Sequence, residues 1–196
     1  TRILWGSRAR YRNTKDIVEE MKYLNGEFGI DAFIFNDDNI SVNKKFILSL
    51  CDAIIESKMK IRWVTGSGIQ VSTLTDEVIQ AMYASGFVVF NLGIETGSAS
   101  TIQKIKKPLK LDVVSEVVCH IRKYGDGYVI GMFIIGFPFE TKEDIQDTLK
   151  FIAGLDLDWN AIYSFHPFPG TSDYDYCVEK GYINKQDFRY TDFTKS

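Results

Sequence analysis

Cysteine is scarce in this chain of 196 residues. It occurs three times, as Cys51, Cys119 and Cys177, and no two of these residues form a C-x-x-C pair. Their spacing excludes a disulfide framework and a zinc site built on paired cysteines. We therefore expect three buried free thiols, as in proteins of a reducing cytoplasm.

Long hydrophobic runs are also missing. The longest apolar stretch, residues 128–139, is interrupted by Gly131, Gly136 and Pro138. Because a membrane-spanning helix needs about 20 consecutive apolar residues, a buried strand explains this stretch better. Nothing near Thr1 resembles a secretory signal. The sequence thus predicts a cytoplasmic protein with no membrane partner.

Basic residues are not in excess. The formal net charge is -3, and the arginines near the start (Arg2, Arg8, Arg10 and Arg12) are interpreted as a solvated or carboxylate-pairing group. Nucleic acid is therefore an unlikely partner on the sequence alone. Hydrophobic residues make up 45% of the chain, which is enough for the core of one domain.

Helical and strand patterns alternate along most of the chain. Apolar periodicity and capping residues predict helices at 13–28, 43–57, 75–86, 111–124 and 141–154, and strands at 32–35, 61–64, 87–94, 128–135 and 159–165. Strands that are apolar on both faces and separated by helices indicate a parallel sheet. Either an open doubly wound sheet or a partial barrel satisfies this α/β pattern. The segment after Tyr174 is expected to be irregular.

Polar residues and glycines follow each of these strands. The groups are Asp37-Asp38-Asn39, Thr65-Gly66-Ser67-Gly68, Glu95-Thr96-Gly97-Ser98, residues 136–140 and His166. The carboxyl ends of parallel strands meet at one edge, where such folds bind ligands. We therefore expect a site for a small polar ligand at this edge.

Glu95 is the sharpest candidate in that site. It ends an apolar strand, where an unpaired carboxylate is costly to bury. A ligand hydroxyl, a ligand ammonium or an arginine should therefore lie opposite it. Asp37 and Asp38 have two interpretations: they bind a metal or a ligand ammonium, or they form a loop and helix-cap pair.

The other candidates are weaker. The Gly66-Ser67-Gly68 turn allows close approach of a ligand, but it is not a known phosphate-binding fingerprint. His120 lies in a predicted helix and is interpreted as structural. His166 follows the last strand, but the sequence shows no cysteine or aspartate partner that would complete a triad or a zinc centre with it.

The ordered strand-end motifs resemble those of radical S-adenosylmethionine enzymes. They read NDDN at 36–39, SGIQV at 67–71, LGIETGS at 92–98, FIIGFPFET at 133–141 and PFPGT at 167–171. WGSRARYR at 5–12 is similar to the segment that follows the cluster loop in that family. The likeness is greatest to the cobalamin-binding branch that includes the magnesium-protoporphyrin ester cyclases.

The resemblance implies a parallel partial TIM-type barrel and a set of cofactors. These are S-adenosylmethionine, a 4Fe-4S cluster that cleaves it reductively to a 5′-deoxyadenosyl radical, and, in the cobalamin-binding branch, cobalamin on an upstream domain. It also implies an electron donor such as flavodoxin or ferredoxin and a small-molecule substrate. By position, the cofactor-binding residues would be Asp37, Asp38, Asn39, Thr65, Ser67, Glu95, Ile134, Gly136, His166 and Pro167.

One departure from the family pattern matters. The family holds its cluster with C-x-x-x-C-x-x-C, and this motif is absent here. We therefore expect residues 1–175 to be a core fragment covering strands two to six, without the first strand and the cluster loop, followed by a tail at 176–196. Such a fragment would be inactive alone, and it would leave an exposed strand edge at residues 32–35.

Three alternatives remain open at this point. The chain could be a ligand-binding barrel that has lost the cluster, or part of a radical methylthiotransferase. It could also be an unrelated barrel enzyme that uses Asp37, Glu95 and His166 for acid–base chemistry.

Overall fold

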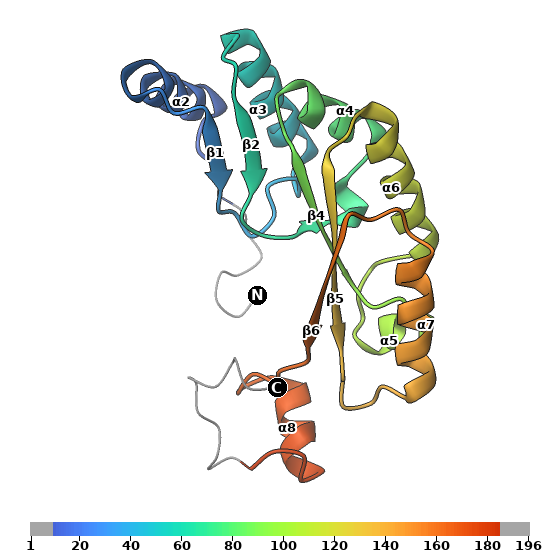
Figure 1. Ribbon diagram of the computed structural model, residues 1–196. Coiled ribbons are helices and arrows are strands. Elements are labelled where there is room, and N and C mark those ends of the chain that lie inside the picture. Colours follow the sequence, from blue (N-terminus) through green and yellow to red (C-terminus); the bar gives the residue numbers. More distant parts are fainter. Residues whose placement is uncertain (1–9, 185–196) are drawn as a thin grey trace.

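A computed structural model describes residues 10–184 of the chain (Figure 1). Its strands are β1 (Ala32–Phe35), β2 (Arg62–Thr65), β3 (Ile69–Gln70), β4 (Val89–Glu95), β5 (Tyr128–Ile135) and β6 (Trp159–Ser164). Its helices are α2 (Thr14–Phe28), α3 (Lys44–Ser57), α4 (Asp76–Ala84), α5 (Ala99–Lys104), α6 (Leu111–Tyr124), α7 (Lys142–Ala153) and α8 (Ser172–Glu179), with a short 3-10 turn η1 (Val71–Thr73).

All strand pairs within this range are parallel. β1 pairs with β2, and β3, β4, β5 and β6 pair in that order. A bridge between Trp63 and Phe87 joins the two groups, because the chain leading into β4 runs beside β2. The predicted parallel α/β sheet is confirmed, with its strands ordered by sequence.

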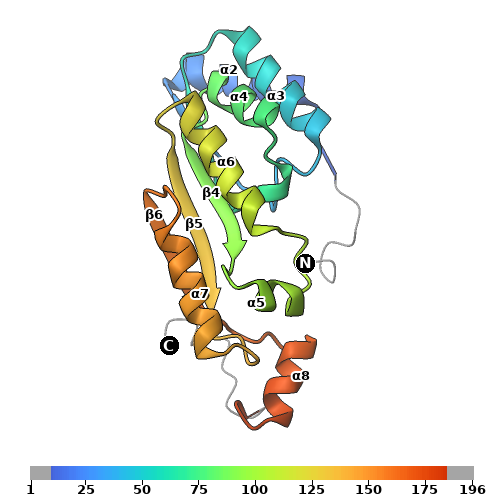
Figure 2. The same ribbon diagram turned by 90° about the vertical axis from the view of Figure 1, so that its right-hand side faces the viewer.

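The helices α3, α4, α6 and α7 cover one face of this curved sheet, and Figures 1 and 2 show that no helical layer formed by residues 10–184 covers the opposite face. The core lies between the sheet and these helices. In β4, every second residue from Phe90 to Ile94 is fully buried against the helices. Glu95 belongs to the other set, which faces the open side. The alternation of β4 thus decides which side chains can meet a ligand.

The predicted helix ends are confirmed in detail. Asn13 caps α2 by accepting from the Lys15 amide, and Gly29 closes its other end at a φ of 67°. Thr141 and Asp144 form a reciprocal capping box at the start of α7. These local signals set the entry of α7 beside the end of β4.

Some expectations were wrong. β6 was expected to be apolar and buried on both faces, but Trp159, Ile162 and Tyr163 are 60%, 43% and 51% exposed. Within residues 10–184, β6 pairs with β5 alone, so one edge lacks a neighbouring strand. The segment after Tyr174 was expected to be irregular, yet α8 runs through Tyr174 to Glu179, capped by Thr171.

The cysteines also differ from expectation. Cys51 and Cys177 are buried free thiols, but Cys119 is exposed on α6. Its helix is amphipathic, and Cys119 lies on the polar face. Burial raises the pKa of the Cys51 thiol to about 11. No helix in the described range is both long and apolar enough to cross a membrane. Residues 5–9 of the WGSRARYR segment, with Arg2 and Arg8, lie outside the described residues.

Candidate functional site

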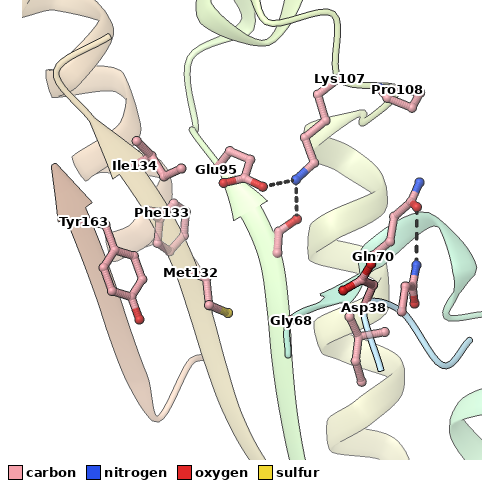
Figure 3. A pocket seen from close by; sticks show the side chains of 13 residues that line it. Asp38, Gly68, Gln70, Glu95, Lys107, Pro108, Met132, Phe133, Ile134 and Tyr163 are labelled. Atoms are coloured by element: carbon pink, nitrogen blue, oxygen red, sulfur yellow. Dashed lines mark hydrogen bonds and ion pairs between the residues drawn. The ribbon is translucent and has the colours of Figure 1, made fainter. Parts of the chain in front are cut away.

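A cavity of about 650 Å³ opens at the carboxyl ends of β3, β4 and β5. Figure 3 shows its lining from the open side of the sheet. The polar and charged side chains at this cavity are Asp38, Asn39, Gln70, Glu95, Lys107 and Tyr163. Glycine, proline and apolar residues complete the lining: Gly68, Ile69, Gly93, Pro108, Met132, Phe133 and Ile134. The predicted edge therefore does carry a hollow of ligand size.

The backbone aims Glu95 into this cavity. The register between β4 and β5 shifts between Gly93 and Glu95, and Glu95 has a φ of 74°. A positive φ is rare for a residue with a side chain, and such strain is held where the surroundings determine it. Bulges of this kind re-aim a side chain at the end of a strand. Here the result is a carboxylate turned toward the open face.

Lys107 is the partner of Glu95. Its Nζ lies 2.7 Å from Glu95 Oε1 and donates to the Gly93 carbonyl at 2.8 Å (Figure 3). The expected arginine or ligand cation opposite Glu95 is thus a lysine of the same chain. The sequence interpretation missed Lys107 because it lies twelve residues further on, in segment 104–110. This segment contains four lysines and is typical of an exposed surface.

The three residues after Glu95 are held by hydrogen bonds to α7. The Thr148 hydroxyl of α7 bonds Thr96 Oγ1 at 2.9 Å and accepts from the Gly97 amide at 3.1 Å. Ser98 Oγ donates to Asp144 Oδ1 at 2.6 Å. These contacts are buried, so Thr96, Gly97 and Ser98 fasten the end of β4 to α7 and do not face the ligand.

Asp144 is the charged centre of that support. The Ser98 hydroxyl, and then the Thr141 amide, hold the pKa of this carboxyl well below its usual range. They outweigh burial, which acts in the opposite direction. The same carboxylate caps α7, so one side chain joins the start of this helix to residues 96–98, which we call the site loop.

The NDDN segment divides between support and lining. Asn39 Oδ1 accepts from the Ser41 hydroxyl at 2.9 Å, and its Nδ2 lies 3.4 Å from Gln70 Oε1. The cap of α3 is Asn43, so Asp37 and Asp38 do not form the helix cap that was the alternative interpretation. Asp38 lines the cavity, whereas Asp37 is exposed beside it and does not.

The predicted residues on the second strand do not line the cavity. Thr65 is buried and donates to the Ser67 carbonyl at 3.0 Å. Ser67 is absent from the lining, and its neighbour Gly68 takes the place at the cavity with Gln70. Thr65 and Ser67 thus shape the turn that presents Gly68, whose lack of a side chain leaves room beside Met132.

The apolar wall comes from β5. Ile134 lines the cavity, together with Met132 and Phe133. Gly136 does not line it. Its amide donates to Glu140 Oε2 at 2.6 Å, which closes the turn that follows β5. At a φ of 83°, Gly136 supplies the left-handed conformation that this turn needs.

The last-strand candidates lie away from the cavity lining. His166 and Pro167 follow β6, and His166 Nδ1 is 3.1 Å from the Ser164 carbonyl. His120 lies on α6, and its Nδ1 is 3.7 Å from Asp76 Oδ1. Asp37, Glu95 and His166 therefore do not meet as an acid–base set around one cavity.

No metal-binding group is found in the part of the chain that the structure describes. No cluster of three or more histidine, cysteine or acidic side chains occurs between residues 10 and 184. None of Cys51, Cys119 and Cys177 lines the cavity. The described residues therefore contain no ligand set for iron.

The chain is similar in sequence to known proteins. The chain is 30% identical over 187 residues to an uncharacterised methyltransferase of Pyrococcus horikoshii, covering 95% of this chain and 40% of that protein. It is 24% identical over 164 residues to the anaerobic magnesium-protoporphyrin IX monomethyl ester cyclase of Cereibacter sphaeroides, covering 83% of this chain and 27% of that protein. The chain thus spans well under half the length of these relatives.

A solved structure shows the same fold. The radical S-adenosylmethionine methyltransferase TsrM of Kitasatospora setae, with cobalamin and a 4Fe-4S cluster bound, superposes with a TM-score of 0.75 at 18% identity. The match covers 86% of this chain and 34% of that one. This likeness confirms the partial TIM-type barrel. The model of the radical SAM superfamily matches residues 3–152, and the chain therefore belongs to that superfamily.

Proposed function

We propose that the cavity binds S-adenosylmethionine and that the chain is the cofactor-binding part of a radical enzyme. The observation that carries this proposal is the meeting of charged side chains and an apolar wall in one cavity. Drug-sized ligands occupy sites of about 300–1,000 Å³, and the cavity of about 650 Å³ lies within that range.

The lining matches the chemical groups of the ligand. Met132 and Ile134, which are only partly buried, offer an apolar surface for the adenine ring. Glu95 offers acceptors for the ribose hydroxyls, and Asp38 offers a negative charge for the amino group. Lys107 is the cation among the described lining residues, and it suits the carboxylate. Asp37, His166 and Pro167 would act from outside the cavity, if ligand binding draws their loops inward.

We propose that the cluster is held by cysteines of the parent protein outside these 196 residues. Two of the three cysteines present are buried, and none lines the cavity. Bound together, the cluster and S-adenosylmethionine would supply a 5′-deoxyadenosyl radical by reductive cleavage. The role of this chain is then to hold the ligand and to exclude competing contacts around it.

The same proposal extends to the reaction and the partners of the parent protein. A methyl transfer to a small molecule is favoured by the methyltransferases of Pyrococcus horikoshii and Kitasatospora setae. The cobalamin in the second of these supports a cobalamin-binding domain in the parent. An electron donor such as flavodoxin or ferredoxin would provide the reducing equivalent, and a reducing cytoplasm suits the free thiols. The alternative is a radical methylthiotransferase, and a product assay that detects a methylthio group in place of a methyl group would reveal it.

Calorimetric titration of the chain with S-adenosylhomocysteine tests the proposal without the cluster. We expect Glu95→Gln to weaken binding about tenfold, since a charge-assisted acceptor for a hydroxyl is lost. Glu116→Gln is the matched control, because Glu116 is exposed on α6. Equal affinities for the wild-type chain and Glu95→Gln, or no binding to either, would contradict the proposal.

A further inference from the structure

The ammonium of Lys107 occupies two oxygens that would otherwise be open to a ligand. It lies 2.7 Å from Glu95 Oε1 and 2.8 Å from the Gly93 carbonyl, both at the end of β4 (Figure 3). Its side chain is 19% exposed, and that of Glu95 is 31% exposed. A pair this sheltered is stronger than an ordinary surface ion pair, because water screens it less.

The loop places Lys107 there by its own geometry. Lys106 has a φ of 53°, which turns the chain sharply after α5. Lys107 precedes Pro108, and a residue before proline is restricted to extended conformations. Lys107 is therefore held between two constrained positions. Its contact with Glu95 is a built feature of the loop.

This contact has a consequence for ligand binding. While Lys107 holds Glu95, a ligand hydroxyl must compete with an ammonium for Glu95 Oε1. A ligand that brings a carboxylate of its own can draw Lys107 away, since an ion pair is exchanged for another ion pair. A ligand without a negative group offers Lys107 no new partner, so it can reach Glu95 Oε1 only by breaking the pair.

We propose that Lys107 acts as a latch: its ammonium stays paired with Glu95 until the carboxylate of the ligand binds the ammonium and frees Glu95. The inference rests on the proposed function, since it takes the ligand to be an adenosyl amino acid. Lys107 is then a specificity-determining residue: it favours ligands with the amino-acid group and rejects nucleosides that lack it. Recognition of the ligand carboxylate is then coupled, through Lys107, to recognition of the ligand ribose.

Two ligands separate the latch from a simple contact. S-adenosylhomocysteine carries the amino-acid carboxylate, and 5′-methylthioadenosine has the same nucleoside without it. In titrations of the full 196-residue chain, Lys107→Met should weaken S-adenosylhomocysteine about tenfold and tighten 5′-methylthioadenosine by about threefold or more. The second change is the informative one, because Glu95 becomes free for the ribose hydroxyls when the ammonium is removed.

Lys110→Met on the same loop is the control, and it should leave both affinities unchanged, since Lys110 is exposed and outside the cavity lining. Lys107→Arg keeps the charge and should retain the preference for S-adenosylhomocysteine, and the thermal unfolding midpoint of each variant checks folding. If Lys107→Met weakens both ligands, or leaves 5′-methylthioadenosine unchanged, the latch is wrong while the proposed function stands. If the wild-type chain binds neither ligand, the proposed function fails and the latch fails with it.

Discussion

At the scale of single residues, Glu95 faces the cavity and the next three residues, 96–98, hold it in place. Glu95 is directed into the cavity by a strained backbone, and Lys107 neutralises it. Thr96 and Ser98 are buried in hydrogen bonds to α7. Gly97 donates its amide to Thr148 and, because it has no side chain, also allows α7 to lie close to its backbone.

Gly97→Ala tests that steric role. A Cβ at position 97 would lie 2.5 Å from Phe151 Cβ and 2.9 Å from Thr148 Cα, closer than packed carbons allow. We expect the free energy of unfolding to fall by about 1–3 kcal/mol, the usual cost of overpacking. Urea denaturation measures this change.

Gly154→Ala is the matched control for that experiment. A Cβ at Gly154 would meet the Phe151 carbonyl at 3.6 Å, an ordinary contact, at a φ of -88°. Its effect should stay within about 0.5 kcal/mol. Equal stability of the Gly97→Ala chain and the wild-type chain would show that α7 does not press on the site loop.

The sequence was sufficient to select Glu95 but not its partner. A carboxylate that ends an apolar strand is conspicuous in a single sequence, because burial requires a partner for it. Lys107 carries no such signal, since lysines at 104, 106, 107 and 110 look alike until the loop is folded. The same limit explains why Thr65 and Ser67 were selected when Gly68 and Gln70 line the cavity.

At the scale of elements, α7 and the end of β4 act as one unit. The capping box that starts α7 and the hydrogen bond that holds Ser98 share the Asp144 carboxylate. Helix capping and site geometry are therefore coupled. A change in the charge of Asp144 should act on both.

The acid stability of the chain tests this coupling. The pKa of Asp144 is lowered on folding, chiefly by the Ser98 hydroxyl, so its contribution is fully present above the unfolded pKa of about 4. This contribution is lost as the pH falls from about 4 toward the folded pKa. We expect Asp144→Asn to cost about 1–3 kcal/mol at pH 7. The difference from wild type should shrink below about pH 4.

Urea unfolding at a series of pH values measures this effect. Asp147→Asn on the same helix is the control, because Asp147 is exposed and pairs only with Lys150 among the contacts described. A wild-type and Asp144→Asn difference that is constant from pH 7 to pH 3 would contradict the assignment.

Long elements were predictable because their signals are local. α2, α3, α6, α7 and β5 agree with the apolar periodicity and the capping residues. β3 and α5 were missed because two strand residues and a six-residue helix carry too little pattern. The exposure of β6 was not predictable, since it depends on which neighbours a strand has and not on its own residues.

At the scale of the whole molecule, the sheet is covered on one face and open on the other (Figures 1 and 2). The cavity lies on the open side at the carboxyl edge. The relatives in Pyrococcus and Cereibacter are more than twice as long as the part of them that this chain matches. Under the proposed function, the cluster and the substrate site would be supplied by protein outside these 196 residues.

The most direct measurement is the formation of 5′-deoxyadenosine from S-adenosylmethionine by the full-length parent. The parent would be reconstituted anaerobically with iron and sulfide and then reduced. The account predicts that 5′-deoxyadenosine forms in the wild-type protein and falls at least about tenfold in Glu95→Gln, while Glu116→Gln behaves as wild type. A folded, cluster-containing parent that yields no 5′-deoxyadenosine, or a Glu95→Gln parent as active as wild type, would contradict it.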